Sequence, residues 1–289
     1  MAKKSLIILA AIVPMVFAPP LRQVGADSSE PHGGPRIVTY NVCGGSCPKQ
    51  LSQREWNDSI TGLLRYADAD VILFQELCHG QYESLQQVLG DRYDSRWGGT
   101  MTGNTGCGKQ WGEGEDEGFG LAVFVRGAGS IRSSERRSLP DEEDHEPRIL
   151  LCVDTALRGR SVRVCDTHLD YHPATERLQA AYVQRVVTPW AARTPLIVGG
   201  DMNATPMLQQ MAGFYRRGDG AFLEADETDR DYFLGEDTEQ GRKVDYIFFS
   251  RRHFESPIGR VAERDRLLSD HQPLLGTASW RAGSERRTS

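Results

Sequence analysis

The chain has 289 residues, of which 39% are hydrophobic and 26% charged, the composition of an ordinary globular protein. This length is enough for one large domain or two small ones, with a sizeable core in either case. The 34 basic and 40 acidic residues leave a formal net charge of −6, which argues against high-affinity, non-catalytic binding to nucleic acid.

The N-terminal segment is predicted to be a signal peptide. Two lysines precede an apolar run over residues 6–18, which is too short to span a bilayer. Small residues predict cleavage after Ala26, and an uncleaved anchor is the alternative. We therefore expect residues 1–26 to be removed, residues 27–35 to form a loose start, and the product to be secreted. No other apolar stretch is long enough for a membrane helix, so no stable membrane association is expected. The protein is expected to be a monomer.

Runs of apolar residues predict the regular elements in chain order. Strands are predicted at 36–42, 71–74, 119–125, 148–155, 161–165, 196–198, 244–249 and 272–277. Helices are predicted after the capping box Ser52–Glu55, over 81–89, at Pro206, and from Pro173 with Leu178, Tyr182, Val186 and Trp190 on one face. Surface loops are expected over 98–118 and 130–146, and a disordered tail over 281–289. This mixture predicts an α+β fold of two packed sheets with helices outside.

Six cysteines in an exported chain predict disulfides. If Arg158-Gly159 forms a two-residue hairpin turn, Cys152 lies directly opposite Cys165, within disulfide reach on antiparallel strands. The remaining cysteines allow three connectivities, and we favour Cys43 with Cys47 and Cys78 with Cys107. A zinc site is the competing interpretation, but Cys-x3-Cys without a second Cys or His pair is poor evidence for one.

Polar residues stand at or beside the ends of several predicted strands. They are Asn41, Glu76, His168, Asp201 with Asn203, Asp245, and Asp270 with His271. Singly, most have a structural explanation, because Gly-Gly-Asp-x-Asn also makes a turn and a lone histidine is more often structural than catalytic. Asp245 is less ordinary, since it interrupts an apolar strand and an unpaired buried carboxylate is costly; it needs a partner, and a histidine would serve.

Six short motifs occur in one order along residues 36–278. They are Thr39-Tyr40-Asn41, Gln75-Glu76, Thr167-His168-Leu169, Gly200-Asp201-Met202-Asn203, Asp245-Tyr246-Ile247 and Ser269-Asp270-His271. In this order the chain resembles the endonuclease/exonuclease/phosphatase superfamily, which includes secreted deoxyribonucleases, abasic-site endonucleases, bacterial sphingomyelinases and inositol-phosphate phosphatases. The resemblance implies one catalytic domain over residues 36–280, folded as a four-layer α/β/β/α sandwich of two packed mixed sheets.

The resemblance also implies a metal site. Glu76 would be the principal ligand, helped by Asn41 and, directly or through water, by Asp270. Carboxylate and amide oxygens without a thiolate suit a hard cation, so Mg²⁺ is expected, with Mn²⁺ as a substitute.

The same resemblance implies roles for the remaining motif residues. His271, oriented by Asp245, would contact or protonate the phosphate, and Asp201 would orient or deprotonate the attacking water. Asn203 would stabilise the developing charge, and His168 would hold a non-bridging oxygen. Some relatives pair an acid with this last histidine. Its neighbours in the sequence, Asp166 and Asp170, need not reach it.

Export, cysteines and a complete set of motif residues favour a secreted Mg²⁺-dependent phosphoesterase, a nuclease acting on DNA. The alternative is a sphingomyelinase-like phospholipid phosphodiesterase, or an inositol or nucleotide phosphatase, on the same fold. A membrane-acting enzyme would want an exposed apolar hairpin, and the 98–118 loop offers only Met101 and Trp111. A non-enzymatic binding or toxin subunit is a third hypothesis. Tyr171 and His172 are predicted to form a turn, and His32, His79, His145 and His253 to lie in loops without a role.

Overall fold

A computed structural model of the protein describes residues 33–45, 47, 51–101, 106–111, 118–141, 145–215, 220–227, 235–263 and 268–283. The predicted signal peptide and most of the segments 27–35 and 281–289 lie outside the described residues. The helices are α1 (Gln53–Ala67), α2 (His79–Leu89), α3 (Gly108–Trp111) and α4 (Pro173–Ala191), with short 3₁₀ turns η1 (Gly90–Arg92) and η2 (Gln209–Met211). The strands are β1 (Arg36–Asn41), β2 (Val71–Cys78), β3 (Tyr93–Met101), β4 (Phe119–Arg126), β5 (Ser133–Ser138), β6 (Ile149–Leu157), β7 (Arg160–His168), β8 (Leu196–Asp201), β9 (Phe222–Glu224), β10 (Asp245–Ser250), β11 (Phe254–Val261) and β12 (Leu274–Trp280).

The described strands form two mixed sheets of six strands each. The first sheet has the order β11-β12-β1-β2-β4-β3, and the second has the order β5-β6-β7-β8-β10-β9. Near the middle of each sheet two strands run parallel, β1 beside β2 and β7 beside β8. Parallel neighbours end at the same edge of a sheet, so the carboxyl ends of these four strands gather the polar residues that follow them.

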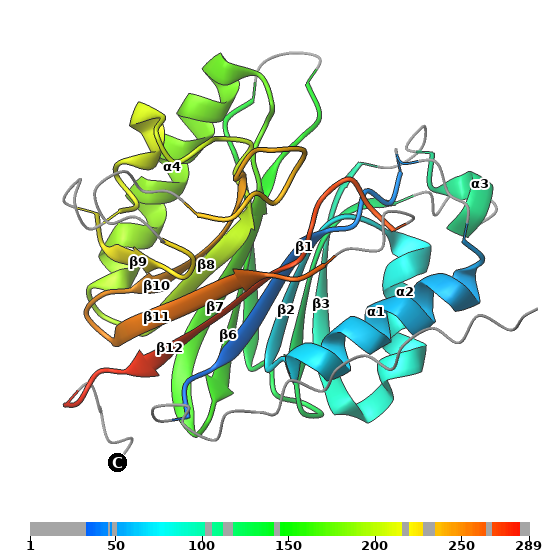
Figure 1. Ribbon diagram of the computed structural model, residues 1–289, viewed down its shortest axis with the longest axis horizontal. Helices are drawn as coiled ribbons and strands as arrows, with labels where there is room; N and C mark the ends of the chain where they lie inside the picture. The colour runs from blue at the N-terminus through cyan, green and yellow to red at the C-terminus, as the bar shows by residue number, and fades with distance from the viewer. Residues whose placement is uncertain are drawn as a thin grey trace, which may run out of the picture. The chain divides into compact units, whose positions relative to one another are not determined.

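Three apolar layers hold the sheets and helices together. Leu73, Val123 and Ile247 belong to the layer between the two sheets. A second layer packs α1 and α2 on the outer face of the first sheet, and a third packs α4 on the outer face of the second. Figure 1 shows the two sheets with α1 and α2 on one side and α4 on the other. The predicted α/β/β/α sandwich is confirmed.

The predicted hairpin is present as β6 and β7. Arg158 and Gly159 both have positive φ, 51° and 79°, as a tight primed turn requires. This turn sets the register in which Cys152 lies opposite Cys165. The structure contains the disulfides Cys152–Cys165, Cys43–Cys47 and Cys78–Cys107, the pairing expected above.

The four strands that the sequence did not predict are the four outer strands of the sheets, β3, β5, β9 and β11. The predicted 98–118 loop begins inside β3 and contains α3, and the predicted 130–146 loop contains β5. Strand β5 has the sequence Ser-Ser-Glu-Arg-Arg-Ser and no buried residue. An edge strand is held by backbone pairing along one side, so it needs no continuous apolar run.

Three helix predictions also need correction. On α4 the buried positions include Gln179, Val183 and Val187, whereas Leu178 is 54% exposed. The small and branched residues Ala180, Val183 and Val187 pack against the second sheet, and the buried Gln179 is satisfied by donating its side-chain amide to the Pro140 carbonyl at 2.9 Å. No helix begins at Pro206; the 3₁₀ turn η2 follows it. His79 is the first residue of α2 and not a loop residue.

Within the described part of the chain, no helix combines the length and apolar character that a membrane span requires.

Candidate active site

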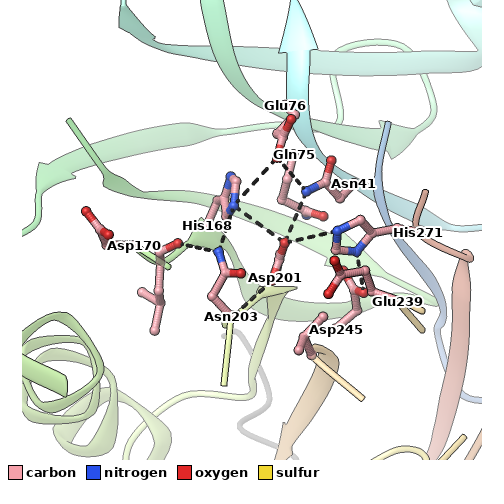
Figure 2. A network of polar contacts seen from close by, with 12 residues as sticks. Asn41, Gln75, Glu76, His168, Asp170, Asp201, Asn203, Glu239, Asp245 and His271 are labelled. Carbon is pink, nitrogen blue, oxygen red and sulfur yellow. Dashed lines mark hydrogen bonds and ion pairs between the residues drawn. The ribbon is translucent and has the colours of Figure 1, made fainter. Parts of the chain in front are cut away.

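The motif residues meet at one end of the two sheets. Asn41 ends β1, Glu76 lies near the end of β2, His168 ends β7 and Asp201 ends β8. Asp245 begins the antiparallel β10 and pairs in register with Asp201, while His271 lies just before β12. Figure 2 shows these side chains, from both sheets, pointing toward one another around Asp201. The parallel pairs and the antiparallel return strands together produce this convergence.

Asp201 is the centre of the cluster. Its Oδ2 accepts a hydrogen bond from Asn41 Nδ2 at 3.0 Å and lies 3.4 Å from His168 Nε2 and 3.6 Å from His271 Nε2. Its Oδ1 accepts from the Asn203 backbone N–H at 2.8 Å. The carboxylate is 1% exposed. Burial raises the pKa of Asp201 to about 7, against the opposing effect of the His271 charge. A carboxylate with this pKa suits proton transfer near neutral pH.

The backbone conformation just before Asp201 requires a glycine at position 200. Gly200 has φ +132°, and a Cβ placed there would overlap the Thr167 carbonyl of neighbouring β7. The turn after Asp201 is held by a residue of β10, because the Tyr246 hydroxyl donates a hydrogen bond to the Ala204 carbonyl at 2.6 Å. The strand can therefore approach β7 closely while it directs Asp201 into the site.

Glu76 is placed by an irregularity in β2. The pairing of β2 with β4 shifts register between Phe74 and Leu77, and Glu76 has φ +53°, a conformation that L residues seldom adopt outside constrained sites. The Glu76 carbonyl accepts a hydrogen bond from the Gly44 N–H at 2.7 Å. The bulge turns the Glu76 carboxylate toward Asn41. Glu76 Oε1 accepts a hydrogen bond from Asn41 Nδ2 at 3.0 Å.

Asp245 and His271 form a buried pair. Asp245 Oδ2 lies 2.8 Å from His271 Nδ1, and both residues are under 10% exposed. Burial opposes the imidazolium charge, but Asp245 and Asp201 outweigh it and raise the pKa of His271 to about 10. Asp245 therefore has the histidine partner that the sequence predicted. His271 is held as a cation, with its Nε2 facing Asp201.

The Nδ1 atom of His168 contacts an arginine and not one of the two neighbouring acids considered above. Arg148 Nη1 lies 2.6 Å from His168 Nδ1, and both side chains are buried. Asp166 is bonded to the Gln75 side chain at 2.6 Å, and Asp170 contacts other histidines. Burial and then the Arg148 charge hold the pKa of His168 well below its usual range. The residue missed from the sequence is Arg148, which carried no signal beyond opening a predicted strand.

Of the cation-binding residues predicted above, Asn41 lies beside Glu76, and Asp270 precedes His271 in the chain. Asn41 bridges the Glu76 and Asp201 carboxylates through Nδ2, and its Oδ1 accepts from the Cys43 N–H at 2.9 Å, so amide coordination requires the Asn41 amide to turn over. Asp270 Oδ1 lies 3.4 Å from the Ser269 hydroxyl. The six cysteines are all in disulfides, so no thiolate competes. The Glu76 and Asp201 carboxylates therefore lie close together on either side of the Asn41 amide. Neighbouring carboxylate oxygens of this kind suit a hard divalent cation.

The comparisons with known proteins agree with this geometry. The Endonuclease/Exonuclease/phosphatase family matches residues 38–271, and a search of curated protein sequences gives no match. The human Nocturnin catalytic domain with bound sulfate is similar in structure, with a TM-score of 0.67 and 18% identity over 86% of this chain and 96% of that one.

Two further structures are similar. A mannosyl-6-phosphatase from Bacteroides thetaiotaomicron has a TM-score of 0.62 and 18% identity, over 84% of this chain and 99% of that one. Truncated Caenorhabditis elegans TDP2 has a TM-score of 0.59 and 15% identity, over 85% of this chain and 97% of that one. At these identities the likeness to solved structures shows the fold alone. The match to the family over residues 38–271 shows that the chain belongs to the Endonuclease/Exonuclease/phosphatase family, whose members are metal-dependent phosphoesterases.

Proposed function

We propose that the protein is an exported, Mg²⁺-dependent phosphodiesterase that cleaves nucleic acid. The observation that carries the proposal is the position of Asp201 between two imidazoles of opposite protonation state, the cationic His271 and the neutral His168, beside the Glu76 carboxylate. A base, an acid and neutral hydrogen-bond donors around one point are what in-line hydrolysis of a phosphoester requires. Three disulfides support export.

In this proposal Glu76 holds the cation, with Asp270 and Asn41 as further ligands. A bound Mg²⁺ supplies Lewis-acid stabilisation of the charge on the phosphoryl oxygens. Asp201 Oδ2 orients the attacking water and accepts its proton. His271, kept cationic by Asp245 at 2.8 Å, donates to the phosphate from Nε2.

His168 and Asn203 bind the non-bridging oxygens. Arg148 donates to His168 Nδ1, so the imidazole proton is on Nε2, the nitrogen that faces Asp201. Asn203 Nδ2 donates to the Leu169 carbonyl at 2.9 Å and lies 3.2 Å from His168 Nε2, so the two N–H groups lie side by side in the site. The two side chains offer neutral N–H donors at the place where charge develops.

The charge balance of the site favours a phosphodiester over a phosphomonoester. The Asp245 carboxylate is matched by His271, and Arg148 is matched by Glu146, 3.0 Å away. Glu76 and Asp201 then balance one divalent cation, and Asp270 adds a further negative charge. A diester carries one negative charge, whereas a monoester near neutral pH carries close to two. A monoester therefore meets more repulsion in this site.

Two surface features favour nucleic acid over lipid. Of the apolar residues in segment 98–118, Trp111 is 6% exposed and packs edge-on against Trp56, and Met101 packs on the same core. Neither side chain is available to enter a membrane. Tyr171, three residues after His168, is 66% exposed, and its ring lies tilted against that of His172 with the centroids 4.0 Å apart. An exposed ring close in the chain to the site can stack on a base.

The test compares purified wild-type protein with Asp201→Asn on plasmid DNA, RNA, a simple phosphodiester, a simple phosphomonoester, sugar and inositol phosphates, and sphingomyelin vesicles. We expect Mg²⁺-dependent cleavage of DNA or RNA that EDTA abolishes, and a roughly 10²–10⁴-fold lower rate for Asp201→Asn. Asp58→Asn, on the exposed face of α1, is the matched control and should retain the wild-type rate. Preferential hydrolysis of a monoester or of sphingomyelin would contradict the substrate assignment, and unchanged activity of Asp201→Asn would contradict its role.

A further inference from the structure

A second group of side chains converges on one carboxylate outside the site described above. Asp170 Oδ2 lies 3.1 Å from His145 Nδ1, and Asp170 Oδ1 lies 2.7 Å from His172 Nδ1. The two imidazole rings stack with their centroids 4.2 Å apart. One ligand atom from each of the three residues lies within 4.8 Å of the other two. Two imidazole nitrogens and a carboxylate oxygen are therefore close enough together to ligate one ion.

This group is separate from the proposed catalytic centre although it begins two residues after His168. Figure 2 shows the Asp170 carboxylate pointing away from Asp201. Asp170 is also not required as the partner of His168, because Arg148 occupies that position at Nδ1. The carboxylate therefore has no role in the phosphoester chemistry derived above.

The group is held by ordered elements and is open on one side. The Asp170 N–H donates to Gln179 Oε1 at 2.8 Å, and the His172 N–H donates to Asp170 Oδ1 at 2.7 Å. His172 immediately precedes α4, so its backbone is fixed by the start of that helix. The Asp170 side chain is 2% exposed, whereas that of His172 is 44% exposed. The carboxylate is therefore buried behind imidazoles that an ion can reach from solvent.

The donor set selects a class of ion. Two imidazole nitrogens with one carboxylate oxygen are the protein ligands of three-ligand zinc sites, and imidazole suits Zn²⁺, Cu²⁺ and Ni²⁺ better than Mg²⁺. The Thr175 hydroxyl, 3.4 Å from His145 Nδ1, can orient a water in the remaining position. We propose that His145, Asp170 and His172 form a second metal site that binds a divalent transition-metal ion of the zinc class.

Such an ion would join three segments of the chain. His145 belongs to the segment before β6, Asp170 lies two residues after the end of β7, and His172 immediately precedes α4. The residues that follow His145 include Arg148, which contacts His168 at 2.6 Å. A bound ion therefore fixes the segment that positions this arginine, and it does so without contacting the phosphoester.

Zn²⁺ titration of the untagged full-length protein by calorimetry, with Mg²⁺ in excess, tests the proposal. We expect one Zn²⁺ to bind, and His145→Gln, His172→Gln and Asp170→Asn each to weaken binding by roughly 10–100-fold or more. Zn²⁺ should raise the melting temperature of the wild type and not that of His172→Gln. Because His172 is partly exposed, this variant keeps the test valid if the buried Asp170 variant does not fold.

Two further variants distinguish this site from the rest of the protein. Glu76→Gln, which weakens the proposed Mg²⁺ site, should still bind the Zn²⁺, so binding can be scored even if no substrate is ever cleaved. His79→Gln removes a histidine outside the group and should bind like wild type. Substitution of Co²⁺ should give a visible absorption band of a histidine-ligated ion, absent in His172→Gln. Absence of Zn²⁺ binding, or binding unchanged in the three ligand variants, would show that the three residues form only a hydrogen-bonded structural cluster.

Discussion

Arg148 donates to Nδ1 of His168 from a distance of 2.6 Å, with both side chains buried. A guanidinium has no acceptor, so Nδ1 must accept and the imidazole proton must be on Nε2. An acid at this position would favour the opposite tautomer and a charged ring. The histidine is therefore neutral with its proton on Nε2, and in the proposed function it donates from there toward the phosphate.

Arg148→Met should lower kcat by about 10²-fold, the size of effect expected when a positioned proton donor is lost, and should raise the pKa of His168, because a nearby positive charge disappears. Imidazole ¹⁵N shifts of His168 by NMR measure the tautomer directly. Since Glu146 pairs with Arg148 at 3.0 Å, the double variant with Glu146→Gln avoids an orphaned buried charge. Arg136→Met, at an exposed arginine, is the control. A His168 that keeps the Nε2–H tautomer without Arg148 would contradict this assignment.

The acid side of the pH–rate profile should report Asp201. Burial raises the pKa of this carboxyl to about 7, and the ionised form is the one that accepts a proton, so kcat/KM should fall as pH drops through this region. A cation near the carboxylate favours its charged form. The midpoint should therefore move to lower pH as the Mg²⁺ concentration is raised. A profile that does not respond to Mg²⁺ would separate Asp201 from the cation site.

Gly200→Ala should destabilise the protein by more than about 2 kcal/mol. The residue has φ +132°, and a methyl group would overlap the Thr167 carbonyl of β7. Urea unfolding measures the change, and activity should fall as well, because the shift displaces Asp201. Gly62→Ala, in α1 with nothing within 4 Å of the new methyl, should instead stabilise by roughly 0.5–1 kcal/mol. Equal stabilities for the two variants would be inconsistent with the structure.

Glu224 should make stability depend on pH. Burial raises its pKa to about 7 from 4.5, against the lowering effect of Lys243, whose Nζ lies 3.2 Å away. Between these pH values the folded state binds more protons at Glu224 than the unfolded state does, so the stability that this group contributes is fully present below pH 4.5 and is lost as pH rises to about 7. This contribution amounts to roughly 3 kcal/mol. Asp201 and His271, whose pKa values are also raised, add a dependence of the same sign in every variant. The loss of stability between pH 5 and pH 8, measured by urea unfolding, should therefore be smaller in Glu224→Gln than in wild type or in Glu83→Gln, on the exposed surface of α2. A Glu224→Gln variant with the wild-type pH dependence would assign the effect to another group.

The sequence alone was enough to predict the inner strands of both sheets, but not the outer strands. Buried strands such as β2 and β8 are continuous apolar runs because both faces are covered, and such runs are visible in a sequence. The outer strand β5 consists of serine, arginine and glutamate. Its place in the sheet depends on backbone hydrogen bonds to β6, which leave no trace in side-chain type.

For the site, the sequence alone determined which residues would gather. The order of the motifs predicted that Asn41, Glu76, His168 and Asp201 belong to one site. These residues lie at the carboxyl ends of two parallel strand pairs, β1 with β2 and β7 with β8, and the structure brings the two pairs together. Only the tertiary structure decided which contacts set the protonation states and tautomers of these residues. The contact of Arg148 with His168, and that of His145 with Asp170, join residues 20 and 25 positions apart. Such contacts depend on how loops and strand register place side chains in three dimensions, and no local pattern encodes them.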